Sequence, residues 1–283
     1  EVLSQSALSR IARRGSGSAC RSLFGGFVAW QSGQHADGSD SLALEVAPRE
    51  HWPDLQVLIC VVNDAKKGTS STAGMQRTVQ TSPLLQHRIK HVVPERMERM
   101  RAAIAARDFS AFTDLTTADS NNFHACCLDT APPIFYMNDT SRAIVMLIEE
   151  LNRARRAEGL DPLAAYTFDA GPNAVLYVRE RDAATLVGVV RHYFANADFD
   201  DTFNVLGQGA GASHRGLQAP AALPELPTSF NAGVIPEQEP GSVRRLIHTR
   251  VGDGPRVLEH GAGPNSLLQA DGTPLRLQRH KRA

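Results

Sequence analysis

The stretch "AAYTFDAGPNAVLYV" at residues 164–178 decides the fold, because it predicts two strands joined by a tight turn. Its two halves are apolar, and the Gly-Pro pair between them is typical of a turn. Residues 55–62, "LQVLICVV", have the strongest strand pattern of the chain, since they are apolar, β-branched and bounded by polar residues. Further strands are expected at 27–31 and within 242–255.

Helical patterns separate these strands along the chain. Apolar residues at helical spacing predict helices at 2–14, from Pro94 through "ERMERMRAAIAARD", and at 108–129, 141–157 and 181–194. Ser or Thr residues at 69–72 are candidate N-caps. Residues 195–240 are rich in Gly, Pro, Ala and Asn, so little regular structure is expected there. Strands and helices alternate without a regular βαβ repeat, which predicts an α+β fold rather than a doubly wound sheet.

The composition excludes several classes of partner. The 283 residues suggest about two domains. Thirty basic residues balance thirty acidic ones, whereas a nucleic-acid binder or a polybasic membrane protein needs a positive excess. No apolar run approaches the ~20 residues of a spanning helix. We therefore expect neither a nucleic-acid partner nor a membrane partner.

The cysteines indicate the redox compartment, and the first residues indicate how the sequence begins. Cys20, Cys60, Cys126 and Cys127 are too few and wrongly spaced for a disulfide framework. A reducing compartment, the cytosol, is expected. The chain opens at Glu1 without Met, inside a helical pattern and without a signal peptide. The expectation is a fragment with upstream sequence missing.

The first candidate site is "GSGSACR" at 15–21. Small residues let backbone N–H groups approach an anion, and Ser16 and Ser18 add hydroxyl donors. Arg21 supplies a planar fork for a carboxylate or phosphate. The alternative is a flexible loop with an exposed arginine.

Two further candidates lie beside predicted helices and strands. "TSSTAGM" at 69–75 offers hydroxyls ahead of a helix, either for phosphate or for N-capping alone. In "TFDAGPNA" at 167–174, Asp169 follows the apolar end of a strand. Its carboxylate could orient or deprotonate a substrate hydroxyl, or it could bond the amides of its own turn.

Other motifs favour structural interpretations. His87 and His91 are spaced i, i+4 without a third ligand nearby, so zinc is not expected. "GQGAG" at 207–211 neither follows a strand nor opens a clear helix, which predicts a loop rather than a dinucleotide site. His124, Cys126 and Cys127 resemble a helix interior more than a nucleophile and its base.

Four phrases occur in order: "ARRGSGSACRSLFGGFVAW", "SSTAGMQRTVQTSPLL", "DSNNFHACCLDTAPPIFYMN" and "AYTFDAGPNAVLY". Their wording and spacing resemble the diphosphomevalonate decarboxylase family of the GHMP kinase superfamily. The resemblance covers about residues 1–205 and resumes at "VRRLIHTRVGDGPRVL". The segment at about 206–240 is the least similar part.

The resemblance implies an ATP-dependent, carboxy-lyase reaction of isoprenoid and sterol synthesis. Mevalonate 5-diphosphate is phosphorylated on its tertiary hydroxyl, and phosphate then leaves as carbon dioxide departs, giving isopentenyl diphosphate. ATP is the co-substrate with Mg²⁺, and family members are generally homodimers. The implied fold joins a ribosomal-protein-S5-like N-terminal domain, here its remainder at 1–53, to a ferredoxin-like C-terminal domain at 54–283. A poorly ordered insert is expected near 206–240, and the family's active site lies in the cleft between the domains.

Individual positions match the family's site by resemblance. Asp169 resembles the essential aspartate, and Arg21 resembles the arginine that grips the substrate carboxylate. Ser16, Gly17 and Ser18 match the diphosphate-binding segment. The remaining substrate-side positions are Ser71, Met75 and Ala170.

One departure concerns nucleotide binding. The family's glycine- and serine-rich loop for ATP, with a lysine and a tyrosine that contact substrate, precedes the helix at which this chain opens. We therefore expect that residues 1–283 alone do not turn over. Two alternatives stay open: another GHMP small-molecule kinase, and a non-catalytic fragment that acts as a binding or dimerisation module.

Overall fold

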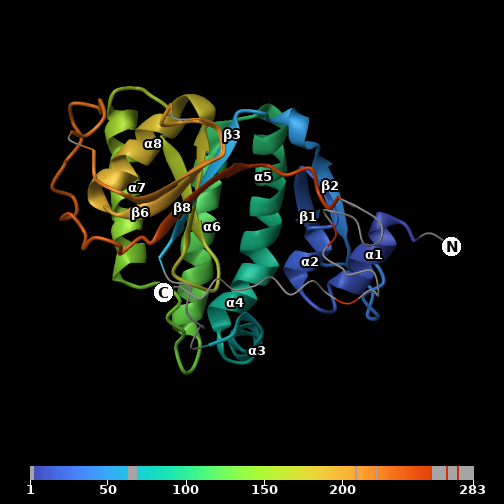
Figure 1. Cartoon of the computed structure of the whole chain (residues 1–283). Coiled ribbons are helices and arrows are strands. Elements are labelled where there is room, and N and C mark those ends of the chain that lie inside the picture. The colour runs from blue at the N-terminus through green and yellow to red at the C-terminus, as the bar shows by residue number, and fades with distance from the viewer. Residues whose placement is uncertain are drawn as a thin grey trace. The chain divides into compact units, whose positions relative to one another are not determined.

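The protein is described here by a computed structural model (Figure 1). Contacts divide the chain into unit 1, Glu1–Arg49 with Gly252–Ala283, and unit 2, Glu50–Val251. The residues that the structure describes are 3–62, 69–207, 209–220, 222–256, 266 and 273.

Unit 1 is built on a two-stranded antiparallel sheet. Ser4 caps its first helix, accepting the Ala7 amide 3.2 Å from Oγ. Ser9 is buried, and its hydroxyl accepts the Ala43 amide at 2.8 Å, which ties that helix to the sheet. The elements are α1 (Gln5–Ala12), α2 (Gly17–Arg21), β1 (Phe27–Trp30) and β2 (Ala43–Ala47).

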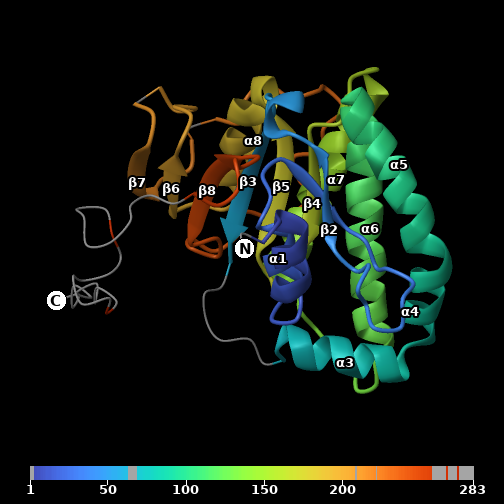
Figure 2. The same ribbon diagram turned by 90° about the vertical axis from the view of Figure 1, so that its right-hand side faces the viewer.

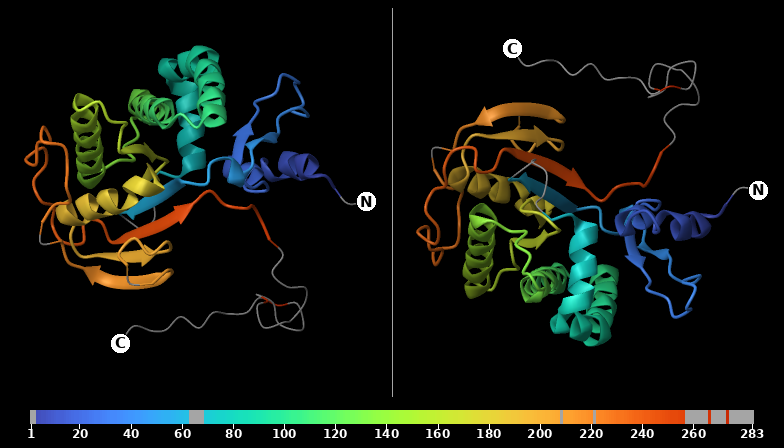
Figure 3. Two further views of the ribbon diagram at one scale, coloured as in Figure 1. Left: turned by 90° about the horizontal axis from the view of Figure 1, so that it is seen from above. Right: turned by 90° about the horizontal axis from the view of Figure 1, so that it is seen from below.

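Unit 2 contains a six-stranded sheet in the order β4-β5-β3-β8-β6-β7, which Figure 2 shows from one edge to the other. Neighbouring strands are antiparallel except β6 and β8, which are parallel. The β6–β7 hairpin lies outermost, beside β8 (Figure 3). The strands are β3 (Leu55–Val61), β4 (Ala164–Phe168), β5 (Ala174–Arg179), β6 (Ala197–Asp201), β7 (Ala212–Leu217) and β8 (Arg245–Arg250).

Several helices of unit 2 begin with a side-chain cap. Ser70 caps α3, and Asn138 with Ser141 forms a capping box on α7. A π-helical segment lies directly before Pro94, whose ring would crowd a carbonyl in a regular helix. The helices are α3 (Ser71–Thr81), α4 (Pro83–His87), the π-helix η2 (Arg88–Val92), α5 (Val93–Ala106), α6 (Phe109–Asp129), α7 (Asp139–Ala157) and α8 (Glu180–Tyr193), and a 3₁₀ turn η1 covers Arg49–His51.

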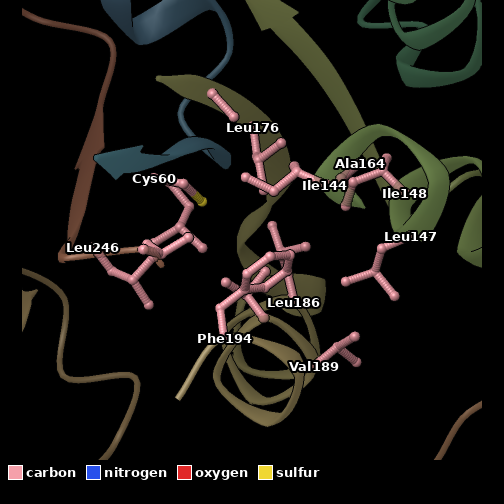
Figure 4. Packing of buried hydrophobic residues seen from close by; sticks show 14 of the residues in the cluster. Cys60, Ile144, Leu147, Ile148, Ala164, Leu176, Leu186, Val189, Phe194 and Leu246 are labelled. Atoms are coloured by element: carbon pink, nitrogen blue, oxygen red, sulfur yellow. The ribbon is translucent and has the colours of Figure 1, made fainter. Parts of the chain in front are cut away.

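The core of unit 2 forms where α7 and α8 meet the sheet. Figure 4 shows Ile144 and Leu147 of α7 and Leu186 of α8 close to the strand residues Leu176 and Cys60. All five side chains are fully buried, and burial of such apolar side chains is the main stabilising term of a fold. Two helices therefore cover one face of the sheet.

A different helix closes one edge of the sheet. Strand β4 is the first strand in the sheet order, and α6 contacts it along its length. Helices α3 and α4 lie at one end of the α5–α6 pair (Figures 1 and 2). Because β4 ends at Phe168, this edge carries the turn that contains Asp169.

The predicted α+β character and most of the predicted elements are confirmed. The strands at 27–31, 55–62 and 164–178 and the helix at 108–129 appear within one or two residues of the expected bounds. The expectation of little regular structure at 195–240 is wrong at 197–217, where β6 and β7 form a hairpin, and is confirmed for the described residues of 218–240. These strands are polar ("ADFDD", "ASHRGL"), so the pairing of β6 with β7 and β8, rather than strand propensity, determines them.

Candidate functional site

The glycine-serine segment of unit 1 forms the short helix α2 with Ser16 as its N-cap residue. The helix begins at Gly17 and ends at Arg21. The hydroxyl oxygens of Ser16 and Ser18 lie 2.9 Å apart on the exposed side of this turn. The two hydroxyls therefore form one pair at the protein surface.

Arg21 folds back onto the same segment. Its Nη1 donates to the Gly17 carbonyl at 2.9 Å, and the Cys20 thiol donates to that carbonyl at 3.1 Å. Cys20 is fully buried, so its thiol holds the Gly17 carbonyl from the interior of the protein. An arginine carries five N–H donors, and the contact with the Gly17 carbonyl sets the direction of this guanidinium. The segment is thus an ordered helical turn rather than a flexible loop.

Packing explains why position 17 is a glycine, and the sequence alone does not reveal this. A Cβ atom at this position would lie 2.6 Å from Cζ3 of Trp30 in β1. Trp30 is itself held, since its Nε1 donates to the Ser41 hydroxyl at 3.1 Å. Glycine here lets the indole lie against α2, besides any access that it gives to a ligand.

In unit 2, the serine-rich stretch opens α3. Ser70 is the N-cap, and its Oγ accepts the Ala73 amide at 3.2 Å. The capping interpretation is therefore confirmed for Ser70. Ser71 is the first helical residue, and Met75 lies one turn later with 58% of its surface exposed. Ser71 and Met75 thus lie near each other on the exposed side of the helix start.

Tyr136 packs against this first turn of α3. A Cβ atom added to Gly74 would lie 2.2 Å from the Tyr136 hydroxyl oxygen. The same hydroxyl lies 3.5 Å from the Ser70 carbonyl, at the limit of a hydrogen bond. Neither Tyr136 nor Gly74 was recognised from the sequence as part of a site.

Asp169 lies at the start of the turn between β4 and β5. The turn is tight, with the Gly171 amide donating to the Asp169 carbonyl at 2.8 Å. Asp169 is exposed, whereas Ala170 beside it is buried. A rigid turn therefore presents this carboxylate at the surface of unit 2.

Side chains of α6 and α7 and the backbone at the end of β3 hold the turn. The Ser141 hydroxyl of α7 donates to the Pro172 carbonyl at 2.8 Å, and the Asn173 side-chain oxygen accepts the Val62 amide at 2.9 Å. From α6, Ser120 Oγ accepts the Phe168 amide at 3.2 Å, and His124 Nε2 lies 3.4 Å from the Phe168 carbonyl. Both ends of the turn are thereby anchored.

Two titratable groups lie in the electrostatic field of Asp169. Burial lowers the pKa of His124 below its ordinary value, while the bond to the Phe168 carbonyl and the negative charge of Asp169 act in the opposite direction. Burial raises the pKa of Tyr136, and Asp169 adds to this while Arg77 opposes it. Tyr136 therefore links the start of α3 to the surroundings of Asp169.

The sequence-predicted residues fall into two groups. Ser16, Gly17, Ser18 and Arg21 form one turn of unit 1, and Ser71, Met75, Asp169 and Ala170 belong to unit 2. The prediction missed Ser120, Ser141, Asn173 and Tyr136 and assigned His124 only to a helix interior. Its one relevant signal was the polar face of the helix at 108–129, on which Ser120 and His124 are spaced i, i+4.

The secondary motifs give no additional site. Among the described residues, no group of three or more His, Cys, Asp or Glu side chains is placed to hold a metal ion. The rings of His87 and His91 lie 4.9 Å apart, centroid to centroid. Gly207, Gly209 and Gly211 have positive φ and lie in the connection between β6 and β7, so the predicted loop is confirmed for the described residues of 207–211. None of the described helices is long and apolar enough to cross a membrane.

Two family models match the chain. The mevalonate 5-diphosphate decarboxylase C-terminal domain matches residues 57–258, and the diphosphomevalonate decarboxylase-like N-terminal domain matches residues 2–43. Proteins named diphosphomevalonate decarboxylase are similar over most of the chain. The relative from Ganoderma lucidum is 59% identical over 96% of this chain and 64% of its own length, and that from Rattus norvegicus is 51% identical over 93% and 63%.

Solved structures of such enzymes are also similar. An X-ray structure of mevalonate 5-diphosphate decarboxylase has a TM-score of 0.74 at 42% identity, covering 97% of this chain and 65% of the other. The enzyme from Trypanosoma brucei has a TM-score of 0.73 at 36% identity, covering 87% and 62%. A protein named MDDEF, in complex with MVAPP, AMPPCP and magnesium, has a TM-score of 0.59 at 35% identity, covering 68% and 56%. The chain thus spans less than two thirds of the length of these relatives.

Proposed function

The chain belongs to the mevalonate 5-diphosphate decarboxylase family, and from this premise we propose that it serves the ATP-dependent decarboxylation of mevalonate 5-diphosphate to isopentenyl diphosphate. The names of relatives up to 59% identical support this reaction. The observation that carries the proposal in this chain is Asp169, an exposed carboxylate on a turn whose backbone is fixed from β3, α6 and α7.

We assign Asp169 to the tertiary hydroxyl of the substrate. A tertiary alcohol is a poor nucleophile, so a carboxylate held in one place can orient it or take its proton. Holding a reacting group in place is itself a large part of catalysis, because it removes the entropy cost of alignment. The short turn from Asp169 to Gly171 supports this role, and Ala170 is assigned to substrate contact beside it.

The anionic ends of the substrate are assigned to unit 1. The paired hydroxyls of Ser16 and Ser18, with Gly17 between them, are assigned to the diphosphate. Arg21 is assigned to the carboxylate that is lost, because a guanidinium matches two carboxylate oxygens with parallel N–H donors. In unit 2, Ser71 is assigned to a phosphate oxygen and Met75 to the apolar part of the substrate.

ATP and Mg²⁺ enter the proposal through the MDDEF structure with AMPPCP and magnesium. The described residues of this chain offer no cluster of three metal-ligating side chains. Mg²⁺ commonly takes only one or two carboxylates and completes its shell with phosphates and water, so this donor set fits an ion carried largely by phosphates. When bound, the ion supplies charge neutralisation on those phosphates.

The finer features of the fold are also proposals. Strands β8, β3, β5 and β4 are neighbours in this order and mutually antiparallel, which supports a ferredoxin-like arrangement for the C-terminal domain at 54–283. We propose the S5-like assignment of 1–53, a cytosolic location, a homodimer and a place in sterol synthesis on family grounds. That residues 1–283 alone do not turn over stays a prediction, which ATP-dependent release of carbon dioxide would refute.

Calorimetry with two ligands tests the proposal on the purified chain. Mevalonate 5-diphosphate carries the carboxylate, the tertiary hydroxyl and the diphosphate, whereas isopentenyl diphosphate carries the diphosphate alone. We expect Arg21→Lys to lower the affinity for mevalonate 5-diphosphate by about tenfold, because one charge-assisted bond is lost. The affinity for isopentenyl diphosphate should change little. The double variant Ser16→Ala with Ser18→Ala should bind both ligands with lower affinity.

The matched control is Arg10→Lys, an exposed arginine of unit 1 whose Nη1 donates to the Ser39 carbonyl. It should leave both affinities unchanged. Equal binding of both ligands by wild type and Arg21→Lys would refute the role of Arg21. No heat of binding from either ligand would refute the assignment of a diphosphate site to this chain.

A further inference from the structure

The outer edge of strand β4 needs hydrogen-bond partners from outside the sheet. A strand at the edge of a sheet leaves every second pair of its backbone groups without a neighbouring strand. At the two ends of β4, side chains of helices bond such groups. At the start of the strand, Asn152 of α7 donates to the Ala164 carbonyl at 2.8 Å and accepts the Leu163 amide at 2.8 Å.

At the end of the strand, α6 performs the same task with two residues. Ser120 Oγ accepts the Phe168 amide at 3.2 Å, and His124 Nε2 lies 3.4 Å from the Phe168 carbonyl. Ser120 is 4% exposed and His124 is 5% exposed. The serine and histidine therefore hold the two polar backbone groups of one residue inside the protein.

Ser120 and His124 together are called the clamp. Phe168, the residue that they hold, directly precedes Asp169 in the chain. The Phe168 carbonyl belongs to the peptide plane whose other end is the Asp169 nitrogen. The orientation of that plane fixes where the nitrogen and Cα of Asp169 lie, and therefore the direction of its side chain. We propose that His124 and Ser120 are positioning residues, which fix the aim of the Asp169 carboxylate by clamping Phe168 on both sides. This inference rests on the role proposed for Asp169.

The hydrogen bond to Phe168 requires a proton on Nε2 of the His124 imidazole. The Phe168 carbonyl only accepts, so His124 must carry its proton on Nε2 to bond it. The ring lies edge-on to Phe123 and Phe168, with centroids 5.1 and 6.2 Å away. The charged group facing the ring is Asp169, while Ser120 and the Phe168 carbonyl are neutral. An apolar residue could fill this space but could not donate.

Three variants of the whole chain test the clamp by NMR. His124→Leu keeps the bulk and removes the donor, His124→Gln keeps a donor near the place of Nε2, and Ser120→Ala removes the acceptor of the Phe168 amide. We expect amide exchange at Phe168 and Gly171 to accelerate by about tenfold in His124→Leu and Ser120→Ala. His124→Gln should restore the exchange rate to within about threefold of wild type, and the change in the chemical shift of the Asp169 carboxyl carbon should follow the same order.

Asn152→Ala is the matched control, because it removes the same kind of bonds at the other end of β4. It should lower the stability of unit 2 and leave the Asp169 carboxyl signal unchanged. Should His124→Leu not fold, Ser120→Ala and His124→Gln carry the test. The proposal is overturned if exchange at Phe168 and the Asp169 signal are the same in wild type, His124→Leu and Ser120→Ala, or if Asn152→Ala shifts the Asp169 signal equally.

The affinity for mevalonate 5-diphosphate separates this inference from the proposed function. If the clamp variants alter the Asp169 signal while wild type binds no mevalonate 5-diphosphate, the clamp stands and the proposed function fails. If wild type binds but the clamp variants change nothing at Asp169, the clamp fails and the proposed function stands. The NMR signals are read without ligand, so neither result depends on turnover.

Discussion

The glycine-serine turn of unit 1 and the Asp169 turn of unit 2 are held in opposite ways. In the first, Ser16 bonds Ser18 and Arg21 bonds Gly17, so the segment organises itself. In the second, distant and largely buried side chains from α6 and α7 fix the backbone. The difference matches the proposed tasks, because a flexible diphosphate tolerates small shifts of its donors, whereas a single carboxylate aimed at one hydroxyl does not.

The largest expected effect concerns the carboxylate itself. In a form of the protein that releases carbon dioxide from mevalonate 5-diphosphate, Asp169→Asn should lower turnover by ~10²–10³, the usual cost of losing one group aimed at developing charge. The substrate affinity should change much less, because the diphosphate and carboxylate contacts are kept. Asp139→Asn, an exposed carboxylate at the start of α7, is the control. Turnover by Asp169→Asn within threefold of wild type would contradict the role.

A smaller effect is expected where Tyr136 meets α3. Gly74→Ala should destabilise unit 2 by about 1–3 kcal/mol, because the added methyl overlaps the Tyr136 hydroxyl. In a Tyr136→Phe background the same change should cost less, since the next atoms lie 3.4 Å away. Urea unfolding of the four proteins completes the double-mutant cycle. Equal costs in both backgrounds would show that the hydroxyl does not restrict this position.

The comparison of the two turns is sharpened by two serine deletions. Ser141→Ala should lower the free energy of unfolding by about 1–3 kcal/mol, because it removes the hydroxyl that bonds the partly buried Pro172 carbonyl and completes the capping box with Asn138. Ser18→Ala should change the free energy of unfolding by no more than about 0.5 kcal/mol, because the Ser18 hydroxyl is exposed. Trp30 lies in unit 1 and Trp52 in unit 2, so variants with one tryptophan report each unit by fluorescence. Equal costs would remove the distinction drawn between the turns.

The smallest expected effect is a dependence of stability on pH. The pKa values of His124 and His248 are lowered, first by burial, so the unfolded chain binds protons more readily than the folded chain. Stability from these groups is present above the unfolded pKa of ~6.5 and is lost as the pH falls through their folded pKa values. Urea unfolding at pH 7.5 and 5.5 should show this loss, and His124→Gln should reduce it. An unchanged pH dependence in that variant would argue against a buried neutral His124.

The sequence predicted what depends on neighbours along the chain. The turn after Phe168, the cap before Ser71 and the apolar strand at 55–62 follow local rules of side-chain pattern and turn chemistry. Asp169 was found because its Gly-Pro turn is visible in the sequence. The hairpin at 197–217 was missed because strands β6 and β7 have few apolar residues and depend on pairing with each other and with β8.

The parts of the candidate site that the sequence did not predict depend on contacts between remote positions. Ser120 and Phe168 are 48 residues apart, and Val62 and Asn173 are 111 apart. No local pattern marks a serine that accepts the amide of a strand edge, because the same residue would be unremarkable on any polar helix face. Family resemblance proposed the residues that would touch substrate, whereas the structure identifies the side chains that hold the turn of Asp169.

The placement of α6 along β4 also bears on aggregation. Unpaired strand edges invite pairing with other chains, and covering an edge removes that hazard. With β4 covered, the six-stranded sheet ends at β7, a short strand in which Arg215 pairs with Asp198 and Gly216 has a φ of 55°. Charges and an irregular backbone at this second edge hinder a neighbouring strand from docking. The helix that aims a carboxylate therefore also keeps the sheet of unit 2 from growing into a fibre on that side.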